Sequence, residues 1–143
     1  MDLLKGNEIL NPWFIGVLWL KIVFSSLALI GSIIGQIEAD FDWWFFIDAV
    51  LMMSAIGGAY LLTQANKIGF YLMVSTNVIM AVICWVKYIN FDTSEYGMFA
   101  TMASQKILQG VWSSIGHILL LLLLMLLPHN GKNVYQILWK SKQ

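Results

Sequence analysis

Charged residues are scarce in this 143-residue chain, and arginine is absent from it. Charged side chains make up 11% of the sequence, whereas soluble domains carry about 25%. All eight cations are lysines, which excludes arginine-rich voltage-sensor helices, bidentate phosphate clamps and arginine fingers. The formal net charge is zero, so the composition gives no indication of a nucleic-acid partner.

Cysteine and histidine are also rare. The single Cys84 excludes an intramolecular disulfide, a CxxC redox pair and a cysteine zinc site. His117 and Asp48 would supply two metal ligands, where zinc takes three or four from the protein. The sequence contains no GxxxxGK[ST] motif, no HExxH motif and no Ser/His/Asp constellation. We therefore expect neither an enzyme nor a bound cofactor or metal.

Hydrophobic residues, in contrast, make up 59% of the sequence, and the mean hydropathy is +0.76. A chain of this length cannot bury so much apolar surface in one globular core, so the lipid bilayer is its expected solvent. The sequence therefore predicts an all-α integral membrane protein. Residues 1–143 are expected to form one domain, a bundle of four transmembrane helices with short loops.

Four apolar segments are long enough to span a bilayer. The expected spans are residues 13–35, 43–63, 67–89 and 106–127. Asn11 and Pro12 suit the N-cap and the first position of a helix, and Pro128 ends the fourth span. The first span is not expected to be a cleaved signal peptide, because its apolar run is too long and Lys21 interrupts it.

Small residues in the first two spans predict close helix packing. Gly31 and Gly35 form a GxxxG pair, which allows two helix backbones to approach. The second span contains Ser54, Ala55, Gly57, Gly58 and Ala59. We expect these small residues to face other helices.

The fourth span is expected to belong to a longer helix. No proline occurs between Glu95 and Pro128, so one helix could run for about 50 Å, against a hydrocarbon core of about 30 Å. We therefore expect residues 95–106 to project from the membrane or to lie in its interface. After Pro128, apolar residues at helical spacing beside lysines predict a short amphipathic helix over residues 133–140, lying on the membrane surface.

Lysine placement predicts the topology, because four spans leave both termini on one side. The lysines that flank this side are Lys5, Lys67, Lys132, Lys140 and Lys142. The loop at residues 36–42, on the other side, is acidic and lacks lysine. By the positive-inside rule both termini are expected in the cytoplasm, and the protein in a bacterial inner membrane.

Polar side chains interrupt the spans at similar depths. The helical rise places five of them near the middle of the membrane: Lys21, Ser25, Ser54, Asn77 and His117. Three more are expected nearer the outer face: Asp48, Gln109 and Ser113. A charge within the membrane is costly unless it is paired. We therefore expect a Lys21–Asp48 pair, either as an ion- or proton-linked site or as a structural pair within or between subunits.

His117 has two interpretations. Its ordinary pKa lies near neutral pH, so it could accept protons during transport. Alternatively, it forms a hydrogen bond with a neighbour such as Asn77 or Ser113.

The fourth span combines a polar face with an apolar half. Gln105, Gln109, Ser113 and His117 share one helical face. Towards the cytoplasm the same helix carries only apolar residues, and three of them would narrow a pore: Leu120, Leu124 and Leu127. Such a hydrophobic constriction can gate by dewetting.

These features predict a small membrane protein that assembles into an oligomeric pore or channel for ion transport. With almost no soluble domain, it would be gated by a protein partner or a ligand, as a membrane effector would be. Its expected partners are therefore the bilayer, further copies of itself and such a gating protein. Two alternatives stay open: an accessory or scaffold subunit of a larger membrane complex, and a small dimeric transporter that uses Lys21 and Asp48.

Overall fold

The computed structural model describes residues 10–37, 43–91 and 100–140. Its long helices are α2 (Pro12–Ile37), α3 (Trp43–Thr63), α4 (Lys67–Ile89) and α5 (Ala100–Met125). A hairpin of β1 (Pro128–His129) and β2 (Lys132–Asn133) leads into the short helix α6 (Val134–Lys140). All four long helices are long and apolar enough to cross a membrane. The predicted all-α bundle with four membrane-spanning helices is therefore confirmed.

The helix boundaries follow the capping residues. The Asn11 side-chain oxygen accepts a hydrogen bond of 2.9 Å from the Trp13 backbone N–H at the start of α2. Asn66 caps α4 in the same way, accepting from Ile68 N–H at 3.0 Å. The bounds of α3 and α4 agree with the predicted spans. The described part of the long fourth helix begins at Ala100, and residues 95–99 of the predicted projection lie outside the described residues.

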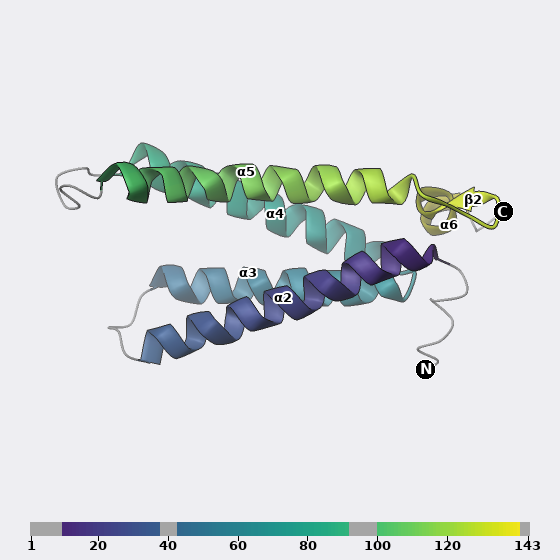
Figure 1. Ribbon diagram of the computed structural model, residues 1–143, viewed down its shortest axis with the longest axis horizontal. Coiled ribbons are helices and arrows are strands. Elements are labelled where there is room, and N and C mark those ends of the chain that lie inside the picture. The colour runs from purple at the N-terminus through teal and green to yellow at the C-terminus, as the bar shows by residue number, and fades with distance from the viewer. Residues whose placement is uncertain (1–9, 38–42, 92–99, 141–143) are drawn as a thin grey trace.

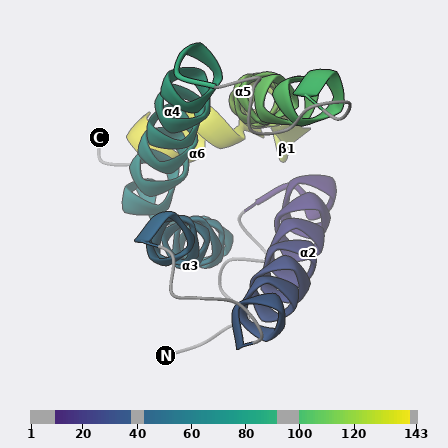
Figure 2. The ribbon, with the colours of Figure 1, turned by 90° about the vertical axis from the view of Figure 1, so that its left-hand side faces the viewer.

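The long helices follow one another around the bundle in chain order (Figure 2). α3 packs against α2 and α4, and α4 packs against α5, so α2 and α5 are the outer members of the series. In Figure 1, α2 begins beside the end of α5 and diverges from it along its length. Burial agrees with this arrangement, because none of residues 19–34 on α2 is buried.

The hydrophobic core lies at the end of the bundle that holds α6. Its largest fully buried side chains are Leu10, Phe14, Leu18, Leu62 and Val134. The Asn11 side-chain amide donates a hydrogen bond of 2.7 Å to the Pro128 carbonyl, which ties the start of α2 to the end of α5. The bundle is therefore closed at the α6 end, where the described chain both begins and ends (Figure 1).

α3 and α4 make their closest approach at two glycines, Gly58 and Gly69. A Cβ atom on Gly69 would overlap the Gly58 carbonyl oxygen, and a Cβ atom on Gly58 would lie 2.9 Å from Met73 Cγ. The predicted close packing of small residues on the second span is thus confirmed at Gly58. Gly31 of the GxxxG pair has open space where a Cβ atom would be, so it makes no such contact with the described part of the chain.

The predicted C-terminal helix is confirmed as α6. Asn130 and Gly131 form the tight turn of the β1–β2 hairpin, with φ angles of 51° and 76°, as two-residue hairpin turns require. Asn133 and Gln136 then cap α6 reciprocally: each side-chain oxygen accepts the other residue's backbone N–H, at 2.8 and 3.1 Å.

Candidate functional site

A cavity of about 300 Å³ lies among the four long helices. We call it the polar cavity, and α2 contributes Lys21 and Ser25 to its wall. The remaining lining residues come from α3 (Leu51, Met52, Ala55), α4 (Thr76, Asn77, Met80, Cys84) and α5 (Gly110, Ser113, Ser114, His117). The structure thus brings together five of the predicted polar residues: Lys21, Ser25, Asn77, Ser113 and His117.

Helical spacing explains why these side chains meet. Lys21 and Ser25 are four residues apart on α2, as are Ser113 and His117 on α5, so each pair shares one helix face. Asn77 lies on α4, which packs between α3 and α5, and its side chain is 9% exposed. The polar faces of three helices therefore converge on one space.

Lys21 is half-buried and makes no ion pair or hydrogen bond with the described part of the chain. None of the described residues that line the polar cavity is acidic. A charged lysine within a membrane is costly when it lacks a counter-charge or water. The polar cavity therefore carries a positive charge that the described part of the chain leaves unneutralised.

Asp48 lies outside the polar cavity and pairs with Lys87 on α4. The Asp48 Oδ2 atom is 4.0 Å from Lys87 Nζ, which in turn lies 4.6 Å from the centre of the Trp44 ring. Within one chain the predicted Lys21–Asp48 pair is therefore wrong. The reason is geometric: Lys21 borders the cavity that α5 also lines, whereas Asp48 is in the second turn of α3, beside the last turn of α4.

The predicted hydrogen bond from His117 to Asn77 or Ser113 is not formed. The Asn77 side-chain amide donates to the Met73 carbonyl within its own helix, at 2.7 Å. The His117 ring has no hydrogen bond with a described residue. Two other predicted residues, Ser54 and Gln109, do not border the polar cavity.

A second, smaller cavity of about 30 Å³ adjoins the first towards the α6 end. Lys21 and His117 border both cavities. The other residues that line this smaller cavity are apolar: Val17, Leu18, Met73, Leu120, Leu121 and Leu124. We call it the leucine constriction. Two of the predicted gate residues, Leu120 and Leu124, line it, whereas Leu127 lies beyond the end of α5 and does not.

The polar face of α5 remains uncovered in a single chain. Gln109, Ser113 and His117 are all exposed. Exposed polar groups within a bilayer need water or another protein surface beside them. This face therefore requires a partner helix or a water-filled space.

The sequence pattern missed several residues of the polar cavity. Thr76 and Ser114 line it and are 7% and 4% exposed. The sequence did indicate which face of α4 lies at the cavity, because residues 73, 77, 80 and 84 follow the spacing of one helix face. Gly110 gave no signal, although a Cβ atom there would lie 2.7 Å from Cys84 Sγ. This glycine allows α4 and α5 to approach beside the cavity.

Over residues 10–37, 43–91 and 100–140, no three His, Cys, Asp or Glu side chains are grouped to hold a metal ion. The polar lining combines hydroxyl, amide, imidazole and ammonium groups, of which the Lys21 ammonium can only donate hydrogen bonds. Comparisons with known proteins find no matching family model, no similar curated protein and no similar solved structure.

Proposed function

We propose that the protein is a membrane channel, assembled from several copies, that passes small anions through the polar cavity. The observation that carries this proposal is the unneutralised Lys21 in a polar cavity that ends at an apolar constriction. Each part of this arrangement has a role in conduction.

Lys21 gives the path its preference for anions. An ammonium group without a carboxylate nearby attracts anions and repels cations, and lysines serve in this way in anion pores. Ser25 and Ser113 add hydroxyl donors beside it, which replace part of the hydration shell of a passing anion.

The leucine constriction acts as the gate. Its volume of about 30 Å³ is small beside the roughly 300 Å³ of the polar cavity. A hydrated ion does not fit such a space, and its apolar walls disfavour water. This conformation is therefore the closed state, and opening requires α2 and α5 to separate near Leu120.

Assembly completes the wall of the path. α2 and α5 are the outer helices of the series (Figure 2). Of these two, α5 exposes its polar face. Another copy packed against this side covers Gln109 and Ser113 and encloses the cavity. By the positive-inside rule, the lysines at the α6 end support a topology with that end and the gate on the cytoplasmic side of a bacterial inner membrane.

The exposed face of α5 also supports a second candidate. If a different protein covers Gln109 and Ser113, the chain is an accessory subunit of a larger membrane complex. The mass of the purified particle distinguishes the channel from the accessory subunit, because the channel requires several copies of this chain and no other protein. The transporter with a coupled Lys21–Asp48 site loses its support within one chain, since Asp48 pairs with Lys87.

The test measures iodide entry into liposomes that contain a halide-quenched dye, with valinomycin and potassium present to balance charge. We expect entry faster than in protein-free liposomes and reduced severalfold by Lys21→Gln. Lys106→Gln, at an exposed position outside the cavity, is the matched control and should behave as the parent. A monomeric particle in nanodiscs that gives no iodide entry would contradict the proposal.

A further inference from the structure

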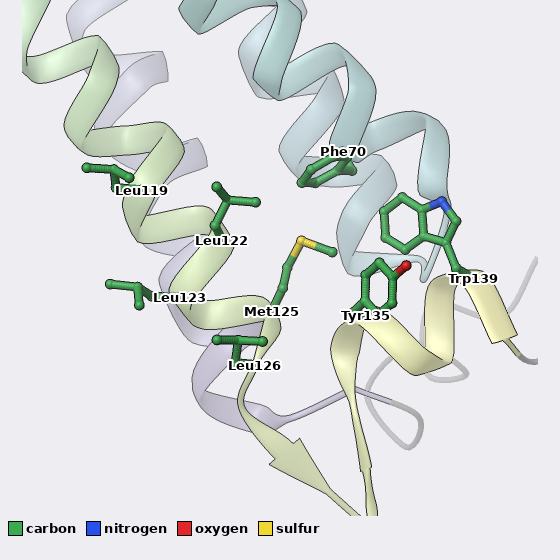
Figure 3. A pocket seen from close by; sticks show the side chains of 8 residues that line it. All are labelled: Phe70, Leu119, Leu122, Leu123, Met125, Leu126, Tyr135 and Trp139. Atoms are coloured by element: carbon green, nitrogen blue, oxygen red, sulfur yellow. The ribbon is translucent and has the colours of Figure 1, made fainter.

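A wholly apolar groove lies on the outside of the bundle at the α6 end (Figure 3). Its volume is about 450 Å³, within the range of about 300–1,000 Å³ typical of small-molecule sites. α5 provides most of its wall, and Phe70 of α4 and two aromatic residues of α6 provide the rest. Figure 3 shows the side chains of Leu122, Met125 and Phe70 around the same space. Leu119, Leu123 and Leu126 are 56–65% exposed, so the groove is open to lipid.

A polar pocket of about 300 Å³ adjoins this apolar groove. Trp139 belongs to the walls of both. The pocket is formed by the turn between α3 and α4, with Gln64, Asn66 and Lys67, and by α6. We call it the Lys67 pocket. An apolar site and a cationic site thus share one side chain as their boundary.

The charged residues that the structure describes at this end are lysines. Lys67 begins α4, Lys132 is in the hairpin and Lys140 ends α6. No aspartate or glutamate occurs in residues 49–91 or 100–143. The Lys67 pocket therefore complements a negatively charged group.

Aromatic side chains indicate how deep in the membrane the apolar groove and the Lys67 pocket lie. Trp139 stacks on Tyr135, with ring centres 5.2 Å apart, and meets Phe70 edge-on at 5.2 Å. Its indole N–H donates to the Tyr71 hydroxyl at 3.4 Å. Tryptophan and tyrosine concentrate at the boundary between hydrocarbon and headgroups. The apolar groove then lies in the hydrocarbon region and the Lys67 pocket at the level of the headgroups.

We propose that the apolar groove and the Lys67 pocket together bind one anionic phospholipid from the leaflet on the α6 side. One acyl chain occupies the groove beside Leu122, and the phosphate lies at Lys67. This molecule matches the two sites in polarity, charge and depth, and it reaches them from within the membrane. The proposal concerns a surface separate from the polar cavity and does not depend on conduction.

Native mass spectrometry of the purified chain in detergent tests this proposal. The probes are phosphatidylglycerol and phosphatidylcholine with identical acyl chains, added at equal concentration. We expect the parent to retain phosphatidylglycerol preferentially. Lys67→Gln should reduce that preference roughly fivefold, the effect of about one lysine at a membrane surface. Leu122→Trp fills the groove and should abolish retention of both lipids.

Two control variants carry the same substitutions away from the site. Lys106→Gln changes an exposed lysine on α5, and Leu27→Trp enlarges a side chain of α2 that is 59% exposed. Both should bind as the parent does. Equal retention of the two lipids by the parent, or retention unchanged by Leu122→Trp, would overturn the proposal. A dimer that Leu122→Trp disrupts while lipid retention persists would assign the groove to a second copy and overturn it as well.

Discussion

Lys21 of α2 and His117 of α5 border both the polar cavity and the leucine constriction, and they are the residues common to the two. Hydroxyl and amide side chains line part of the cavity on one side of this pair, and only apolar side chains complete the lining on the other side. On the proposed path, a solute that moves between the two cavities passes these two side chains. The pair therefore marks the point at which the proposed path changes from polar to apolar.

Leu120→Ser should increase the basal leak of anions. Leu120 lines the leucine constriction and is 47% exposed, so a hydroxyl there favours water in the constriction without removing a core side chain. We expect severalfold faster iodide entry into liposomes. Ile115→Ser, on the same helix and outside both cavities, is the control. Equal rates for Leu120→Ser and the parent would exclude the constriction as the gate.

Asp48→Asn should leave anion entry unchanged. Asp48 pairs with Lys87 rather than with Lys21, and the two side chains are 36% and 30% exposed. Pairs with such exposure contribute about 1 kcal/mol or less to stability. Thermal unfolding in detergent should therefore show a small decrease, shared by Lys87→Gln. A large loss of iodide entry in Asp48→Asn would place Asp48 on the path and contradict its assignment here.

Gly69→Ala should destabilise the bundle by about 1–3 kcal/mol, the usual cost of overpacking a close contact. The new Cβ atom meets the Gly58 carbonyl and the Leu62 backbone nitrogen, and backbone atoms cannot rotate away. Gly57→Ala is the matched control on α3, because a Cβ atom there meets nothing within 4 Å. The free energy of unfolding in detergent should fall only for Gly69→Ala. Equal values for the two variants would refute the close α3–α4 contact.

Gln109→Cys should form disulfide-linked dimers in membranes when the native Cys84 is replaced by alanine. Gln109 is exposed on the polar face of α5, which the proposed assembly covers with another copy. Val82→Cys is the control, since Val82 is 57% exposed on α4. Mild oxidation followed by electrophoresis measures the linked fraction. If both variants cross-link to the same extent, the contact is random collision and the assembly on this face is not supported.

Much of the fold could be predicted from the sequence. Asn66 and the polar turn before it fixed the boundary between α3 and α4, because a side-chain cap satisfies the free N–H groups of a helix end. The end of the fourth span was equally clear at Pro128. The two predicted spans on either side of Asn66 accordingly agree with the structure at both ends.

The pairing between helices could not be predicted in the same way. Depth along a helix follows from the rise per residue, but the rotation of each helix follows from packing contacts that a single sequence does not display. Lys21 was therefore assigned to Asp48 by depth, whereas rotation turns it towards the cavity that His117 also lines. The pairing of Asp48 with Lys87 could not be predicted for the same reason.

The reversal potential in a planar bilayer tests the central claim most directly. With a tenfold gradient of potassium chloride across the bilayer, the account predicts discrete channel currents whose reversal potential lies towards the equilibrium potential of chloride. In Lys21→Gln the reversal potential should move towards zero. Reversal towards the potassium potential, or the absence of any channel current from both the parent and Leu120→Ser, would contradict the account.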